Sequence, residues 1–154
     1  QLSRRVMARE ILRHRYGMDY FPPVESVHNY IDFTDGIIRK GAISAHAGEE
    51  VVIPLSMADG LVYGRGKGQA DWNFSAPHGA GRKLPRTHAR QNIPLESFQK
   101  VMQVAQVWTT CVGKDTLDEA PQAYKKAEEI LGKLDPTVEV IDHLKPVYNF
   151  KAAE

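Results

Sequence analysis

The sequence lacks several features that would place it in familiar classes of protein. It holds a single cysteine, Cys111, which excludes an internal disulfide and fits a reducing compartment. No apolar run approaches the length of a membrane-spanning helix, so we expect no membrane partner. The net charge is only +1, so any surface for nucleic acid must be a local patch. Neither a Walker loop nor the paired spacing of a zinc site is present.

What is present suits one folded unit with a hydrophobic core. The chain has 154 residues, of which 42% are hydrophobic and 25% are charged, a composition typical of globular proteins. It begins with Gln1, and its first residues have the character of the interior of a longer sequence. We therefore expect the chain to be a fragment of a larger polypeptide.

Periodicity and turn residues predict an α+β fold, a complex mixed arrangement of short antiparallel strands with flanking helices. Residues 2–17 indicate an amphipathic helix whose arginines either face solvent or contact RNA phosphates. A flexible cationic loop is expected at residues 64–68. The expected strands are residues 27–33, 37–39, 43–47, 51–54, 61–63, 105–112, 138–141 and 147–150, and the other expected helices lie within residues 83–92, 95–103 and 118–131.

The stretch from Asn73 to Arg82 carries the clearest chemistry. His78 can act as a nitrogen nucleophile or as a base, because imidazole can be neutral near physiological pH. The Gly-Ala-Gly that follows lets the backbone approach a ligand and offer its N–H groups. Arg82 adds a planar set of donors that suits phosphate. These residues predict a site that attacks a phosphoryl group; the alternative is a plain strand-to-loop turn with a solvated arginine.

Residues 75–82, Ser-Ala-Pro-His-Gly-Ala-Gly-Arg, resemble the His-Gly-Ala-Gly-Arg segment of the RtcB-type RNA-splicing ligases. The resemblance runs from about Val27 to Lys151 and follows the order and rough spacing of that family's C-terminal half. The further matching segments are Arg39-Lys40-Gly41-Ala42-Ile43-Ser44-Ala45, Ala47-Gly48, Ile53-Pro54 with Ser56-Met57, and Glu119-Ala120-Pro121-Gln122-Ala123-Tyr124-Lys125.

The resemblance implies that residues 1–154 are the C-terminal portion of a larger single catalytic domain. Such an enzyme joins RNA 2′,3′-cyclic phosphate or 3′-phosphate ends to 5′-hydroxyl ends in tRNA splicing or RNA repair. It uses GTP and manganese and passes through a covalent histidine–GMP intermediate, which here falls on His78. The implied partners are RNA (tRNA halves or broken RNA), GTP and the N-terminal half of the same polypeptide, and the implied location is cytoplasmic. Because most metal ligands would lie in that N-terminal half, the fragment alone is expected to be inactive.

The resemblance also assigns roles to individual residues. His28 is implied as a manganese ligand, with a structural or surface residue as the alternative. Tyr124 is placed near the guanine, or else packs on the core. The nucleotide-binding positions implied are His28, Asn29, Pro54, Leu55, Ser56, Met57, His78, Gly79, Ala80, Gly81, Tyr124 and Lys151, and the nucleophile is His78.

Three positions depart from the family pattern: Leu55 stands where Gly is usual, and Leu61 and Pro85 stand where Ser is common. The departures at Leu55 and Leu61 leave the preference for GTP over ATP open. Together with Pro85 they motivate one alternative function, a module that binds nucleotide or RNA without covalent chemistry. A second alternative is a metal-dependent phosphodiesterase or phosphatase, because the same metal and phosphate pocket could direct water at the phosphate.

Overall fold

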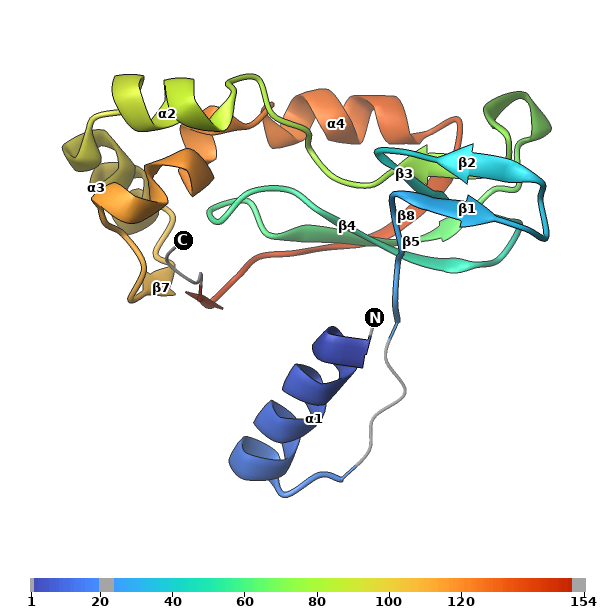
Figure 1. The fold of residues 1–154 in the computed structure, drawn as a ribbon, viewed down its shortest axis with the longest axis horizontal. Coiled ribbons are helices and arrows are strands. Elements are labelled where there is room, and N and C mark those ends of the chain that lie inside the picture. The colour runs from blue at the N-terminus through green and yellow to red at the C-terminus, as the bar shows by residue number, and fades with distance from the viewer. Residues whose placement is uncertain (1, 20–23, 151–154) are drawn as a thin grey trace.

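The computed structural model describes residues 2–19 and 24–150. Its first element is the helix α1 (Leu2–Tyr16), which ends at Gly17 as the sequence predicts. Figure 1 shows α1 apart from the rest of the chain, and none of its residues is buried. Arg5 ties the helix to the following segment through an ion pair of 2.7 Å with Glu25. No helix within the described ranges is long and apolar enough to cross a membrane.

The body of the molecule is built on short strands, most of them paired antiparallel (Figure 1). The central sheet has the order β4-β5-β8, and three two-stranded sheets surround it. The pairs are β1 (Tyr30–Asp32) with β2 (Ile37–Arg39), β3 (Ala42–Ser44) with β6 (Ser75–Pro77), β4 (Glu50–Pro54) with β5 (Leu61–Gly66), β5 with β8 (Val138–Leu144), and, in parallel, β7 (Trp108–Thr109) with β9 (Tyr148–Asn149). The predicted α+β class is confirmed.

The loop predicted at residues 64–68 is wrong for residues 64–66, because these residues belong to β5. The reason lies in the glycines. A Cβ on Gly64 would meet the carbonyl oxygen of Glu139 at 2.6 Å, so only glycine lets β5 approach β8 this closely. The chain therefore uses these glycines for close strand packing, where the sequence suggested flexibility.

The helices α2 (Arg86–Asn92) and α3 (Leu95–Val104) lie at the end of the molecule opposite the β1–β2 hairpin (Figure 1). The helix expected at residues 118–131 is confirmed only for residues 127–131, which lie in α4 (Ala127–Leu134), and is wrong before them. Pro121 disfavours helical backbone at Ala120, which is extended, and Tyr124 is extended as well. In chain order, the helical elements after β5 are η1 (Ala70–Trp72), α2 (Arg86–Asn92), α3 (Leu95–Val104), η2 (Lys114–Glu119), η3 (Pro121–Ala123) and α4 (Ala127–Leu134).

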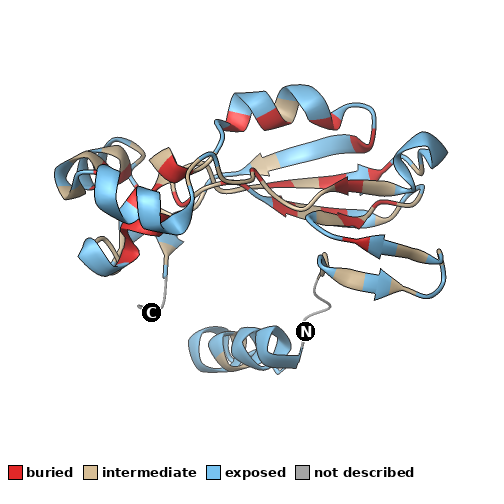
Figure 2. Ribbon diagram, turned by 45° about the horizontal axis from the view of Figure 1, so that its top comes forward, coloured by how far each residue is buried: buried red, intermediate tan, exposed pale blue. Residues whose placement is uncertain are grey.

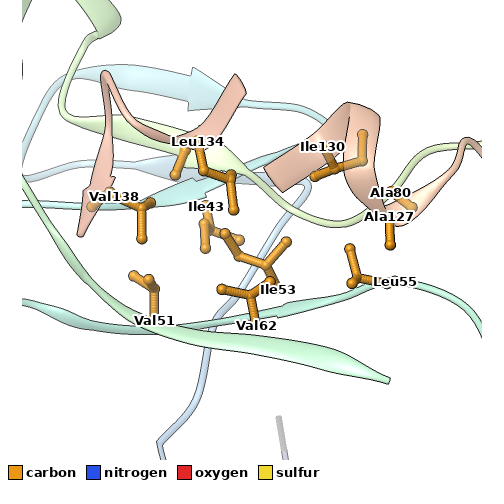
Figure 3. Packing of buried hydrophobic residues seen from close by; sticks show 12 residues of the cluster. Ile43, Val51, Ile53, Leu55, Val62, Ala80, Ala127, Ile130, Leu134 and Val138 are labelled. Atoms are coloured by element: carbon orange, nitrogen blue, oxygen red, sulfur yellow. The ribbon is translucent and has the colours of Figure 1, made fainter. Parts of the chain in front are cut away.

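Two hydrophobic clusters form the core. The first joins the sheets to α4, with Ile43, Ile53 and Leu134 buried at its centre (Figure 3). The second fills the helical end around Phe98 and Met102. Figure 2 shows buried positions concentrated along the strands, on the inner side of α4 and within the helical end. Half-buried Tyr124 packs against both clusters, so its segment lies at their junction.

A buried arginine supports the β1–β2 hairpin. Arg39 is only 1% exposed, and its guanidinium forms ion pairs with Asp32 and Asp35. Its Nε donates to the hydroxyl of Ser75 on β6 at 3.0 Å, and His46 also pairs with Asp35 at 2.9 Å. This network links the hairpin to the strand that leads into His78.

Candidate functional site

His78 follows the last residue of β6, where the β3–β6 pairing places it beside Gly41. Its Nδ1 lies 2.7 Å from the carbonyl oxygen of Gly41, and its backbone N–H donates to the same oxygen at 3.3 Å. A carbonyl oxygen only accepts hydrogen bonds, so Nδ1 must carry the proton. In the neutral ring the lone pair therefore lies on Nε2, which is the nitrogen able to attack an electrophile.

His28 contacts His78, and Asn29 contacts Gly41. The His28 ring stacks on the His78 ring, with centroids 4.7 Å apart and planes 27° apart. The Asn29 side-chain oxygen accepts a hydrogen bond of 2.8 Å from the backbone N–H of Gly41. Desolvation lowers the pKa of His28, and the neighbouring His78 and Arg4 lower it further, so the neutral form is favoured. The structure thus brings His28 and its neighbour Asn29 to the segment around His78, which lies far from them in sequence.

The glycine turn packs on the end of β4. A Cβ on Gly79 would meet the carbonyl oxygen of Pro54 at 2.8 Å, and the N–H of Ala80 donates to that oxygen at 3.1 Å. Gly81 has a left-handed φ of 69°, and nothing lies within 4 Å of the position of its absent Cβ. The amide of Ala80 is therefore used within the fold, and the turn is held close against Pro54.

A cavity of about 660 Å³ opens beside this turn. Seven of the predicted residues line it: Pro54, Leu55, His78, Gly79, Ala80, Gly81 and Tyr124. The rest of its lining comes from Arg82, Arg86 and Arg90, together with Asp115, Thr116, Asp118 and Glu119. Three guanidinium groups and the His78 turn therefore line the same cavity. We call it the arginine cleft.

The remaining predicted residues lie elsewhere. Ser56 closes a tight turn, because its hydroxyl donates to Asp59 at 2.6 Å and accepts from the N–H of Ala58. Met57 is 3% exposed and belongs to the second core cluster. His28 lines a second cavity of about 880 Å³ on the α1 side of His78. Lys151 lies outside the described residues.

Ion pairs hold the arginines of the cleft in place. Arg86 pairs with Asp118 and, at 2.9 Å, with Glu119, while Arg90 reaches Asp118 at 3.1 Å. Desolvation raises the pKa of Asp118, but the hydrogen bonds from Arg90 and Arg86 outweigh it, so the pKa lies below its usual value. The sequence analysis missed both carboxylates. In the sequence, Glu119 is marked only as the first residue of the segment 119–125 that resembles the ligase family, and Asp118 only as its acidic neighbour.

Arg82 and Tyr124, which both line the arginine cleft, are in direct contact. The Arg82 guanidinium lies 4.7 Å from the centre of the Tyr124 ring, and its Nη2 donates to the Tyr124 hydroxyl at 2.8 Å. The same nitrogen donates to Glu119 at 2.5 Å, and the Tyr124 hydroxyl donates to Glu119 at 2.8 Å. Burial, followed by the bond to Glu119, raises the pKa of Tyr124 to about 12. Tyr124 is thus neutral, and Arg82 covers one face of its ring.

The resemblance implies a manganese site, which needs several ligating side chains close together. Among the residues that the structure describes, no group of three or more histidine, cysteine, aspartate or glutamate side chains could hold a metal ion. His28 has the neutral imidazole that a metal ligand requires, but it is a single donor next to a second histidine. The described residues therefore do not make a complete manganese site.

An activated histidine beside an arginine-lined cleft can carry out phosphoryl transfer. Comparison with known proteins gives the family. The model of the family described as tRNA-splicing ligase RtcB matches residues 1–152, and the chain belongs to this family. It is 35% identical over 126 residues to RNA-splicing ligase RtcB and to RNA-splicing ligase RtcB1, both from Escherichia coli. It is 29% identical over 86 residues to tRNA-splicing ligase RtcB of Aeropyrum pernix.

The matches cover a much larger share of this chain than of its relatives. The matches to the Escherichia coli proteins cover 78% of this chain but only 30% of those proteins, and the match to the Aeropyrum pernix protein covers 54% and 18%. The chain thus spans less than a third of the length of these relatives.

Proposed function

We propose that the protein containing this chain is an RNA ligase that joins 2′,3′-cyclic phosphate or 3′-phosphate ends to 5′-hydroxyl ends with GTP. Membership of the tRNA-splicing ligase RtcB family supports the reaction class. The observation that carries the proposal for this chain is the 2.7 Å bond from His78 Nδ1 to the Gly41 oxygen. It leaves Nε2 as the free nucleophilic nitrogen at the edge of the arginine cleft.

In the proposed step, Nε2 of His78 attacks the α-phosphorus of GTP. A nitrogen–phosphorus bond forms, the bond from the α-phosphorus to the bridging oxygen breaks, and pyrophosphate leaves. The hydrogen bond of Nδ1 to Gly41 and the stacked His28 ring keep the imidazole from turning. The product is a histidine–GMP phosphoramidate, from which GMP passes to the RNA 3′-phosphate before the 5′-hydroxyl displaces it.

The cleft has the features that a nucleotide phosphate needs. Gly81 lines the cleft, and nothing lies within 4 Å of the position of its absent Cβ, so the backbone there is open to a ligand. The guanidinium groups of Arg82 and Arg86 also line the cleft and can stabilise charge on phosphate oxygens. Tyr124 presents a neutral ring for a base, with one face already covered by Arg82. We propose Pro54, Leu55, Gly79, Ala80 and Gly81 as the floor of this nucleotide site.

Manganese, the cytoplasmic location and the RNA partner stay predictions. When bound, manganese would supply a positive charge near the reacting phosphate. In this chain His28 would provide one ligand, and the others would have to come from elsewhere in the polypeptide. No step above is routed through the metal.

The test is RNA sealing by the full polypeptide with manganese, GTP, and RNA ends bearing a 3′-phosphate and a 5′-hydroxyl. We expect the wild type to seal the ends and His78→Ala to leave them open. The matched control is His88→Ala, because His88 is an exposed histidine on α2. RNA binding without sealing by the wild type would contradict the ligase and favour a binding module. Removal of the phosphate without GTP, even by His78→Ala, would instead favour a phosphatase.

A further inference from the structure

The arginine cleft contains a carboxylate that contacts three of its functional side chains. One oxygen of Glu119, Oε1, accepts from Arg82 at 2.5 Å and from Arg86 at 2.9 Å. The other, Oε2, accepts from the Tyr124 hydroxyl at 2.8 Å. Glu119 is 16% exposed, so these bonds lie in a partly desolvated setting where charge-assisted hydrogen bonds are strong.

The contacts around Glu119 fix the directions of two cations. Arg82 is only 24% exposed, and it also donates to the backbone oxygen of Asp118 and lies over the Tyr124 ring. Arg86 is half-exposed, and it is shared between Glu119 and the buried Asp118. A long arginine side chain has several rotatable bonds, so a shared acceptor is needed to hold two guanidinium planes in one arrangement.

The geometry points to Glu119 as a positioning residue that aligns Arg82, Arg86 and Tyr124 for a phosphate-bearing ligand in the arginine cleft. This inference rests on the proposed function, because it needs a phosphate to enter the cleft. Glu119 itself is an anion and does not bind the phosphate. It acts through the two arginines, and the Tyr124 hydroxyl holds its second oxygen.

The phosphate in question has two sources, the nucleotide and the RNA 3′ end. The experiment therefore measures binding of both to the full polypeptide. The probes are GTP, an oligoribonucleotide with a 3′-phosphate, and the same oligoribonucleotide with a 3′-hydroxyl, which reports binding that does not need the terminal phosphate. The variants are Glu119→Gln, which keeps the size and removes the charge, Glu119→Asp, which keeps the charge, and Glu128→Gln, an exposed acid on α4 that serves as control.

We expect Glu119→Gln to weaken binding of one phosphate probe by about tenfold to a hundredfold, the range for groups that orient a functional side chain. The probe that weakens identifies the source of the phosphate. Binding of the 3′-hydroxyl oligoribonucleotide and the melting temperature should change little, and Glu119→Asp should recover part of the loss. A merely structural role would lower the melting temperature and leave the binding constant of the folded protein unchanged.

The inference is overturned if Glu119→Gln binds both phosphate probes as Glu128→Gln does, or if the wild type binds neither. Should Glu119→Gln not fold, Tyr124→Phe removes the hydroxyl that donates to Oε2 and accepts from Arg82, and it should weaken the same probe to a smaller extent. Tyr124→Phe binding with wild-type affinity would then count against the inference. Failure of the proposed function is distinct: the wild type would bind phosphate with dependence on Glu119 but would not seal RNA.

Discussion

The replacement of Gly79 by alanine tests the packing of the turn that follows the candidate nucleophile. A Cβ at this position would lie 2.8 Å from the carbonyl oxygen of Pro54, which belongs to the backbone of β4. An ordinary contact begins at 3.4 Å, so the turn must retreat by about 0.6 Å. The same oxygen accepts the N–H of Ala80 at 3.1 Å, and a retreat of that size stretches this hydrogen bond.

The size of the effect follows from these two contacts. Overpacking one methyl group against a fixed neighbour costs about 1–3 kcal/mol. Weakening the bond from Ala80 adds up to about 1 kcal/mol. We therefore expect Gly79→Ala to destabilise the protein by about 1–4 kcal/mol, which lowers the melting temperature by roughly 2–16 °C for a chain of this size.

Thermal and urea unfolding of the purified protein measure this change. The control is Gly113→Ala, because Gly113 has extended backbone and nothing lies within 4 Å of the position of its absent Cβ. It should stay within about 0.5 kcal/mol of the wild type. The reasoning is refuted if Gly79→Ala is as stable as Gly113→Ala, because the turn would then not be pressed against Pro54.

Two further predictions concern buried charge. Arg39→Met leaves Asp32 and Asp35 without their arginine, so urea unfolding should show the free energy of unfolding lowered by about 3–5 kcal/mol. The control Arg65→Met, at an exposed position, should lower it by almost nothing. Equal losses in the two variants would refute the role of the Arg39 network. Arg39, followed by His46, holds the pKa of Asp35 below its usual value. The contribution of ionised Asp35 to stability is therefore complete above about pH 4 and is lost as the pH falls through the lowered pKa of this residue. Urea unfolding at a series of pH values should show stability falling in this window, with a shallower fall in Arg39→Met; equal slopes would contradict the assignment.

The strands were predictable because their signals are local. Apolar residues and glycine-bearing turns alternate over short distances, and the β1–β2 hairpin follows from Thr34-Asp35-Gly36. The error at residues 118–131 has a local cause too, since Pro121 and the extended Tyr124 interrupt what periodicity suggested was one helix. At Gly64, by contrast, the decisive contact is with Glu139 on another strand, which a local pattern cannot reveal.

The candidate site was predictable only in part, for the same reason. Resemblance identified His78 and His28, but their stacking depends on the β3–β6 register. Arg82 was expected to point at phosphate, and its pairing with Glu119 joins residues 37 positions apart. Such tertiary partners decide how a side chain is oriented, and one sequence gives no direct signal for them.

We expect His78 to react through Nε2, because Gly41 holds the proton on Nδ1. The most direct test incubates the full polypeptide with manganese and GTP labelled at the α-phosphate, and then locates the label. We predict acid-labile, alkali-stable label on His78, joined to Nε2 when the phosphoramidate is analysed by phosphorus NMR, and none on His78→Ala. Label on Nδ1, or on another residue, would contradict the account. An unlabelled wild-type protein would contradict the covalent step itself.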